Sequence, residues 1–302
     1  MNNLNLQSEV RKLKKQRDAL ILAHNYQNDE VQDIADHVGD SFALSRLAAE
    51  TSHNVIVFCG VHFMAESAAV LSPDKTVLLP APDAGCPLAE TAKPETVKIW
   101  KKKHPHAATV AYINSSAAVK AESDICCTSA NAVKIVRSLE NEEVIFLPDQ
   151  NLGTYVAAQI PEKTIHLWPG SCLTHHKVKA GEVTELKNLH PEAETLVHPE
   201  CRPEVLALAD FTGSTAQIME RVGKSKASSF IIGTEMGVIH GLKKKYPDKQ
   251  FFLLSKKLVC VDMKKITLRK IVSSLREMKP VISVPEPVCS RAGLALERMM
   301  NR

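Results

Sequence analysis

The chain repeats one pattern of short apolar runs three times, and each repeat ends at a cysteine. Cys86, Cys172 and Cys260 stand 86 and 88 residues apart, each after the third apolar run of its repeat. Self-similarity at a fixed period indicates a repeated structural unit, so the sequence predicts three similar domains that each supply one thiol. The apolar runs begin at Ala19, Val55 and Thr76, at Thr109, Val144 and Thr164, and at Thr195, Phe230 and Phe251.

Amphipathic stretches of helical period separate these runs, for example at 30–38 and 41–51. Strands that alternate with helices are typical of parallel sheets covered by helices on both faces. We therefore predict an α/β fold of three homologous, three-layered αβα domains with three strands each, in a pseudo-threefold arrangement around a central active site. The domains are expected at residues 1–88, 89–175 and 176–262, and the C-terminal residues 263–302 are expected to pack back on the first domain.

The composition excludes several classes of protein. Of the 302 residues, 44% are hydrophobic, yet no apolar run approaches the ~20 residues that a membrane span needs. The first residues form a charged helical pattern without a secretory apolar core, so we expect a cytoplasmic protein with no membrane partner. The net charge of +4 is mild, and the lysine runs are interpreted as solvated helix ends, so we expect no nucleic-acid partner.

Polar residues gather where the predicted strands end. The first strands are followed by residues 24–26, 114–116 and 198–200, and the third strands lead to the three cysteines. In parallel α/β sheets, ligands bind beyond the carboxyl ends of the strands. If all three sets of strand ends face one cavity, the three thiols meet there.

Three convergent thiolates favour an iron-sulfur cluster over a structural zinc ion. Structural zinc usually takes four protein ligands, two of them in a C-x2-C motif, and the chain has no such motif. A cubane held by three thiolates leaves one iron free to bind substrate as a Lewis acid. A lone cysteine is more often a small buried apolar residue, and this interpretation is kept for Cys59, Cys126, Cys127, Cys201 and Cys289.

A second threefold motif lies about 20 residues after the start of each first run: GDS ending at Ser41, CTS ending at Ser129, and GST with Ser214 and Thr215. Each precedes a predicted helix. A serine or threonine there is a routine N-cap, and the same helix N-terminus offers free N–H groups to a carboxylate or phosphate. Both interpretations are compatible, and three such ends at one cavity favour a ligand with several anionic groups.

The longer motifs resemble those of the quinolinate synthases, in the same order and at the same spacing over nearly the full length. They include ILAHNYQ, AGCPLAE, PDQNLG, PGSCLTHH, HPEC, TGST, GTEMGVIHGLKKKYPDK and CVDMKKITL. The resemblance implies one [4Fe-4S] cluster bound by Cys86, Cys172 and Cys260. It also implies a transferase of NAD biosynthesis that condenses iminoaspartate with dihydroxyacetone phosphate to quinolinate, releasing phosphate and water, with L-aspartate oxidase as the functional partner that supplies the imine.

The same resemblance assigns roles to individual residues. It implies that Tyr26 and Glu200 are catalytic acid-base groups. It further implies that the substrate carboxylates and phosphate are held by His24, Ser41, Tyr112, Asn114, Ser129, His175, His198, Ser214 and Thr215. Because Cys260 is followed by Val261, Asp262 and Met263, the C-x2-C-x2-C motif of some family members is absent here.

Two other functions remain open at this point. A [4Fe-4S] dehydratase of a small hydroxy acid would use the same Lewis acid without needing a triose phosphate. An electron carrier or redox sensor would need neither the polar strand ends nor an open iron, and it would favour a fourth fixed ligand.

Overall fold

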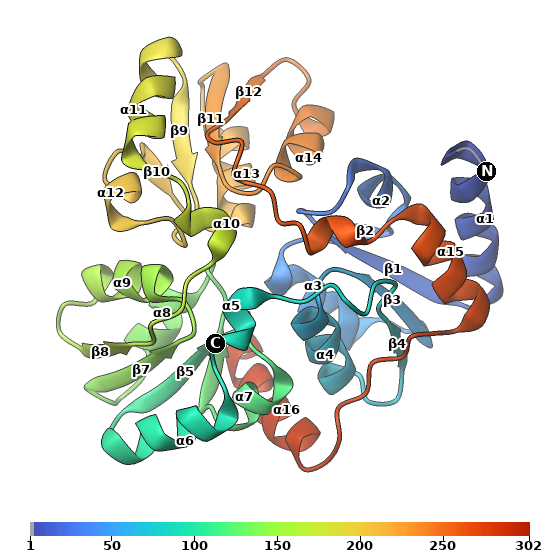
Figure 1. Ribbon diagram of the computed structural model, residues 1–302, viewed down its shortest axis with the longest axis horizontal. Coiled ribbons are helices and arrows are strands. Elements are labelled where there is room, and N and C mark those ends of the chain that lie inside the picture. Colours follow the sequence, from blue (N-terminus) through green and yellow to red (C-terminus); the bar gives the residue numbers. More distant parts are fainter. Residues whose placement is uncertain (1–2) are drawn as a thin grey trace.

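The computed structural model describes residues 3–302 and contains three four-stranded parallel sheets, each flanked by helices (Figure 1). The strand order is β2-β1-β3-β4 in the first sheet, β6-β5-β7-β8 in the second and β10-β9-β11-β12 in the third. This is one topology used three times, and Figure 1 shows the three sheets placed around a common centre. The predicted α/β fold of three αβα domains is confirmed.

The first domain comprises the first sheet and the helices around it. Its strands are β1 (Ala19–His24), β2 (His37–Gly39), β3 (Val55–Cys59) and β4 (Thr76–Leu78). Its helices are α1 (Asn3–Gln16), α2 (Asp29–Ile34), α3 (Ser41–Glu50) and α4 (His62–Leu71). All of β1 and β3 is buried, as expected for central strands covered on both faces.

The second and third domains repeat this order. The second has β5 (Ala108–Tyr112), β6 (Ile125–Cys127), β7 (Glu143–Leu147) and β8 (Thr164–Leu167), with α5 (Pro87–Glu90), α6 (Pro94–Lys103), α7 (Ala117–Ala121), α8 (Ala132–Arg137) and α9 (Gln150–Gln159). The third has β9 (Glu194–Val197), β10 (Phe211–Thr212), β11 (Ser229–Gly233) and β12 (Gln250–Leu253), with α10 (Leu173–His176), α11 (Ala180–Leu189), α12 (Pro203–Leu206), α13 (Thr215–Lys224) and α14 (Val238–Lys245).

Each sheet contains one strand more than the sequence analysis predicted. The additional strands β2, β6 and β10 are two or three residues long and lie at the edge of their sheets. The stretch 30–38, predicted as one helix, divides into α2 and β2. Strands this short carry no detectable period, so periodicity could not reveal them.

A partly exposed polar contact recurs in all three domains. One aspartate before the short edge strand accepts a hydrogen bond from a backbone amide of the first strand, and one lysine pairs with that aspartate. The pairs are Lys14–Asp36, Lys101–Asp124 and Lys187–Asp210. The pairs recur every 86 to 88 residues, so the repeat of the sequence is also a repeat of tertiary contacts.

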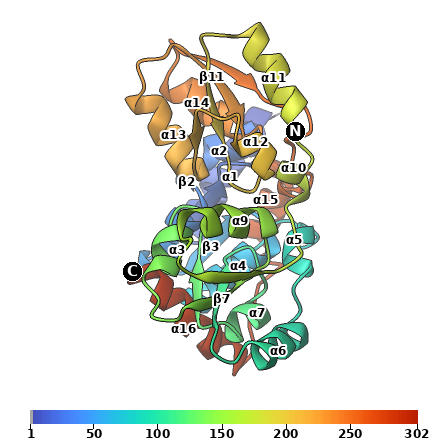
Figure 2. The same cartoon turned by 90° about the vertical axis from the view of Figure 1, so that its left-hand side faces the viewer.

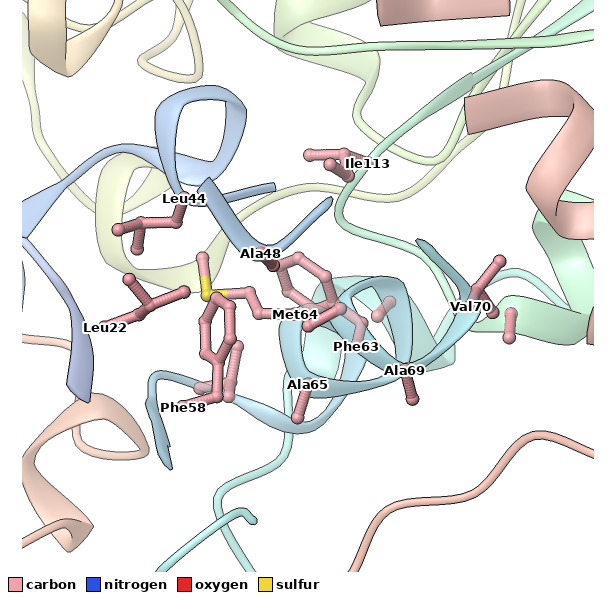
Figure 3. Packing of buried hydrophobic residues seen from close by; sticks show 14 of the residues in the cluster. Leu22, Leu44, Ala48, Phe58, Phe63, Met64, Ala65, Ala69, Val70 and Ile113 are labelled. Carbon is pink, nitrogen blue, oxygen red and sulfur yellow. The ribbon is translucent and has the colours of Figure 1, made fainter. Parts of the chain in front are cut away.

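The hydrophobic core is shared unequally. One cluster of buried residues runs through the first and second domains and includes Phe58, Phe63 and Met64 around α4, together with Ile113 after β5 (Figure 3). The third domain has two separate clusters, one on each face of its sheet. The first two domains therefore form one apolar body to which the third is attached.

The C-terminal residues connect two domains. After the 3-10 turn η1 (Met263–Lys265), helix α15 (Leu268–Glu277) packs on α1 of the first domain. Helix α16 (Val288–Met300) packs mainly on α7 and β6 of the second domain and also on α4 of the first (Figures 1 and 2). The expected packing of 263–302 on the first domain stays a prediction; α15 and α16 both contact that domain, and α16 contacts the second domain as well. Its apolar stripe shows which face is buried but not which partner covers it.

No helix within the described residues is both long and apolar enough to cross a membrane.

Candidate functional site

The pairing of strands identifies equivalent positions in the three domains. The last residues of β3, β7 and β11 each pair with one residue of β1, β5 and β9, respectively. The pairs are Cys59 with Ala23, Leu147 with Ala111, and Gly233 with Val197. Counted from these pairs, the equivalent residues at the ends of the first strands are His24, Tyr112 and His198, and two positions later Tyr26, Asn114 and Glu200. The six residues thus form two threefold sets at matching carboxyl ends.

One central cavity of about 180 Å³ lies at these strand ends. It is bounded by all three domains, which explains why residues far apart in the sequence meet there. The predicted site residues that line it are His24, Tyr26, Ser41, Cys86, Tyr112, Asn114, Ser129, Cys172, His175, His198, Glu200, Thr215 and Cys260. Ser214 alone among the predicted site residues does not line it.

Ser214 has a structural partner instead. Its Oγ accepts a hydrogen bond from the amide of Gln217 at 3.2 Å, and its own amide donates to Oε1 of Gln217 at 2.8 Å, which forms a capping box for α13. The equivalent residue of the first domain is Asp40, which caps α3 through the amide of Ala43.

The hydroxyls that face the cavity stand one position later. Strand register makes Ser41, Ser129 and Thr215 equivalent, and all three line the cavity. Neither Ser41 nor Ser129 is the N-cap of its helix, since α3 begins after Asp40 and α8 begins after Asn131. Ser41 and Ser129 therefore line the cavity and do not cap a helix.

Glu200 lies at the centre of a buried polar network. Its Oε2 is 2.8 Å from Nδ1 of His175 and 3.4 Å from Nδ1 of His198, and Nδ2 of Asn114 donates to its Oε1 at 3.5 Å. Burial opposes the charge of this carboxylate, but the hydrogen bond and charge of His175 outweigh it and lower the pKa of Glu200 below its usual range. Glu200 is therefore ionised at neutral pH.

Two buried histidines near Glu200, His24 and His198, have lowered pKa values. Burial lowers the pKa of His198 to about 3, although the charge of Glu200 acts in the opposite direction. Burial, together with the charge of Lys264, lowers the pKa of His24 to about 3 as well. Both imidazoles are neutral near pH 7 and can each donate and accept one hydrogen bond. Nε2 of His198 lies 3.2 Å from Oγ of Ser129.

The hydroxyl of Tyr26 is held by two threonines. Its hydroxyl lies 2.7 Å from Oγ1 of Thr215 and 2.7 Å from Oγ1 of Thr234, both in the third domain. Burial, followed by the charge of Glu200, raises its pKa above the usual value. The phenol therefore keeps its proton at neutral pH, next to a carboxylate that has lost its own.

Each of the three cavity cysteines stands before a helical turn. Cys86 and Cys172 are the residues immediately before α5 and α10, and Cys260 stands shortly before η1. Burial raises the pKa of all three thiols, and that of Cys86 to about 12. Hydrogen bonds from backbone amides of the following turn oppose this rise in each case. A metal centre deprotonates a coordinating thiol outright. Three buried thiols at one cavity, each with backbone donors behind it, fit such a centre.

Two buried carboxylates hold the backbone of two of these cysteines. The amide of Cys172 donates to Oδ2 of Asp149 at 2.8 Å, and the amide of Cys260 donates to Oε1 of Glu235 at 3.1 Å. Asp149 and Glu235 each stand two residues after the third strand of their sheet, where the first domain has Val61. The sequence analysis missed this function, although both acids follow predicted strands.

The two anchoring carboxylates have different surroundings. Burial raises the pKa of Glu235, and the charge of Lys264, whose Nζ lies 3.1 Å from Oε1 of Glu235, acts in the opposite direction. Burial and the charge of Glu200 raise the pKa of Asp149 to about 8. The sequence analysis also missed Lys177 and Lys257, two cations that line the cavity.

The remaining cysteines lie away from the cavity. Cys59, Cys126, Cys127 and Cys201 are buried in the apolar clusters, Cys289 is partly buried on α16, and no disulfide joins any of the cysteines in the described chain. This matches their interpretation as ordinary buried residues.

The fold and the cavity define an enzyme built from three α/β repeats with three cysteines at its centre. The chain belongs to the quinolinate synthetase A protein family, whose pattern matches residues 8–301. It is 56% identical to the quinolinate synthase of Caldicellulosiruptor bescii over 100% of this chain and 99% of that protein. It is 55% identical to quinolinate synthase 2 of Methanosarcina acetivorans over 97% of this chain and 94% of the relative. The quinolinate synthase of Clostridium kluyveri is 54% identical, with 100% and 99% covered.

Proposed function

We propose that this chain is a cytoplasmic quinolinate synthase that condenses iminoaspartate with dihydroxyacetone phosphate and releases phosphate and water, as a step of NAD biosynthesis. The observation that carries the proposal is the meeting of one cysteine from each domain with Tyr26 and Glu200 at a single cavity. Membership of the family supports the same reaction.

Cys86, Cys172 and Cys260 are the proposed ligands of a [4Fe-4S] cluster. When bound, the cluster supplies a Lewis acid at the iron that lacks a protein thiolate. No fourth cysteine of the described chain lines the cavity, which supports an iron that is open to substrate. Asp149 and Glu235 fix the backbone of two ligands, so the thiols are positioned before any metal arrives.

Glu200 and Tyr26 divide the proton transfers between them. Ionised Glu200 accepts a proton from a substrate carbon or hydroxyl, and the protonated phenol of Tyr26 donates one to a leaving oxygen. His175 steadies Glu200 through the 2.8 Å contact of its Nδ1, while its Nε2 lies 3.0 Å from Oγ1 of Thr234. The network therefore fixes the base and couples it to the hydroxyl that also holds Tyr26.

The substrates bring two carboxylates and one phosphate, and the cavity offers matching donors. Ser41, Ser129 and Thr215 present one hydroxyl from each domain, and Lys177 and Lys257 add positive charge. Oδ1 of Asn114 is buried and has no partner within the described residues, so it is available to accept a hydrogen bond from the substrate imine or a hydroxyl.

An anaerobic assay tests the proposal. The cluster is reconstituted, iminoaspartate is generated in place by L-aspartate oxidase, which is the proposed functional partner, and quinolinate is quantified with and without dihydroxyacetone phosphate. The proposal expects quinolinate only when both substrates are present. Turnover of a lone hydroxy acid, with no quinolinate from the two substrates, would identify a dehydratase instead.

A further inference from the structure

A second group of metal-binding side chains lies outside the central cavity. His104, Glu143 and His166 place one ligand atom each within 4.8 Å of one another. His104 follows the last residue of α6, Glu143 begins β7 and His166 lies in β8. Glu143 thus stands at the amino end of its strand, opposite to the carboxyl ends that form the cavity (Figure 1).

The geometry of the three side chains suits an ion. Nε2 of His166 lies 2.9 Å from Oε2 of Glu143, and the rings of His104 and His166 face each other with centroids 3.8 Å apart. His166 and Glu143 are diagonal neighbours on one face of the sheet, because Glu143 pairs with Thr164 and Ile145 with His166. About a quarter of the His166 side chain and two fifths of that of Glu143 are exposed, so an ion can reach them from solvent.

An apolar wall stands behind the group. Trp100, on the last turn of α6, contacts the ring of His104 and packs on buried Trp168 with centroids 5.0 Å apart. An apolar surround on one side and solvent on the other is usual for protein metal sites, because it limits water access and strengthens the bond to the ion.

Among the described residues, the equivalent corner of the third domain has no metal-binding side-chain group, so a comparison shows which of these residues packing alone requires. There the equivalent residues are His190, Ser229 and Phe252, and His190 stacks on Phe252 with centroids 3.6 Å apart. His104 and His190 occupy the same position after their helices and have nearly the same backbone angles. Packing at this corner of the domain therefore needs only an aromatic ring on the strand. Where the third domain has the phenyl ring of Phe252 and the hydroxyl of Ser229, the second domain has the imidazole of His166 and the carboxylate of Glu143.

We propose that His104, Glu143 and His166 bind one divalent transition-metal ion of the zinc class. Two imidazoles and one carboxylate are a ligand set that zinc uses, with the remaining position open to water. The ion joins the end of α6 to β7 and β8. Because the site lies on one face of the sheet, at the amino end of β7 and outside the central cavity, the ion stabilises the second domain and takes no part in the central chemistry.

Zinc binding to the reconstituted protein tests the proposal, with the central thiols occupied by their cluster. After equilibrium dialysis against zinc, elemental analysis is expected to find one zinc per chain more in the wild type than in His166→Phe. Loss of an outer partner of a metal ligand alone weakens binding ~10–100-fold, so loss of a direct ligand is expected to weaken it by ~100-fold or more. The third domain shows that a phenyl ring fits this position, so His166→Phe is expected to fold.

Glu143→Ser is a second variant that copies the third domain, and it is expected to lose the ion as well. His190→Gln is the matched control, because it alters the equivalent histidine that lacks metal-binding neighbours, and it is expected to retain the ion. Anomalous diffraction at the zinc edge should place the ion between the three side chains. Equal zinc contents in the wild type and His166→Phe, or an anomalous peak elsewhere only, would overturn the proposal.

Discussion

The junction between the first two domains and the attachment of the third differ in chemistry. The first and second share one hydrophobic cluster, reinforced by α16 between α4 and α7. The third contacts the first through polar groups: Nε2 of Gln32 donates to the carbonyl of Gly237 at 2.9 Å, and Oδ1 of Asp33 lies 2.9 Å from both Nε2 of His240 and Nζ of Lys244. Cys86, Cys172 and Cys260 all pack against that shared cluster, whereas Glu200 is positioned by hydrogen bonds and an ion pair.

The contacts that attach the third domain include residues of the site itself. The hydroxyl of Tyr26 contacts Thr215 and Thr234, and Nδ2 of Asn151 donates to the carbonyl of Glu200 at 2.8 Å. Exposed ion pairs contribute ~0–1 kcal/mol each, far less than a buried apolar side chain. The comparison teaches that changes at the first junction should reduce stability, while changes at the second should reduce activity.

The largest effect is expected at the cysteines, where the two regions must act together. Cys86→Ala, Cys172→Ala and Cys260→Ala should each abolish the proposed cluster, because two thiolates do not retain a cubane against loss of iron. Cys289→Ala on α16 is the control and should keep it. Iron and sulfide analysis after anaerobic reconstitution measures this, and a full cluster in Cys172→Ala or none in Cys289→Ala would refute the ligand assignment.

The next effect separates chemistry from assembly. Glu200→Gln and Tyr26→Phe should keep the proposed cluster and the fold but lose ~10²-fold or more in kcat, the scale expected when an acid-base group is removed. Glu204→Gln, an exposed carboxylate nearby on α12, should leave kcat unchanged. Near wild-type kcat in Glu200→Gln with both substrates saturating would remove Glu200 from the mechanism.

The free energy of unfolding tests whether the apolar junction contributes more stability than the polar attachment of the third domain. Leu296 on α16 is fully buried, so Leu296→Ala should lower the free energy of unfolding by ~2–5 kcal/mol. Leu294→Ala on the same helix, where the side chain is 53% exposed, should cost far less. Asp33→Asn at the polar attachment should cost no more than ~1 kcal/mol. Denaturant unfolding measures all three, and a larger loss in Asp33→Asn than in Leu296→Ala would reverse the comparison.

The smallest effect concerns pH. The pKa of His24 is about 3 in the folded chain and near 6.5 in the unfolded chain, so the unfolded state binds more protons between these values. Stability therefore falls as pH drops below 6.5, by about 1.4 kcal/mol at pH 5.5 for this one group. His24→Gln should weaken that dependence, to which buried His198 also contributes, while His106→Gln, which alters an exposed histidine, should leave it unchanged. Equal pH dependence in the wild type and His24→Gln would contradict the burial of a neutral imidazole.

The sequence predicted the features that repeat and failed where a contact depends on tertiary position. Strands β1, β5 and β9 carry apolar runs, and the residues after them form known motifs, so the fold and thirteen of the residues that line the cavity could be predicted. The caps could not: Ser41 and Ser214 look alike in sequence, and only strand register shows that Asp40 is the equivalent of Ser214.

The sequence also could not predict that Asp149 and Glu235 anchor the backbone of two cysteines. Asp149 and Glu235 look like ordinary polar residues after a strand, and their function depends on amides 23 and 25 residues further along the chain. Each lies too far from its cysteine in sequence for a local motif to connect them. The first domain, where Val61 takes this place, shows that the anchor is not part of every repeat.

The central claim is that three thiolates from three domains leave one iron open to the cavity, and Mössbauer spectroscopy tests it most directly. Spectra of the reconstituted protein are recorded with and without saturating quinolinate, which offers a ring nitrogen and an adjacent carboxylate to a metal. The account predicts a changed signal for one iron of the four, with the other three nearly unaltered. Four unchanged irons at saturating quinolinate would contradict it and indicate a cluster that is structural or carries electrons.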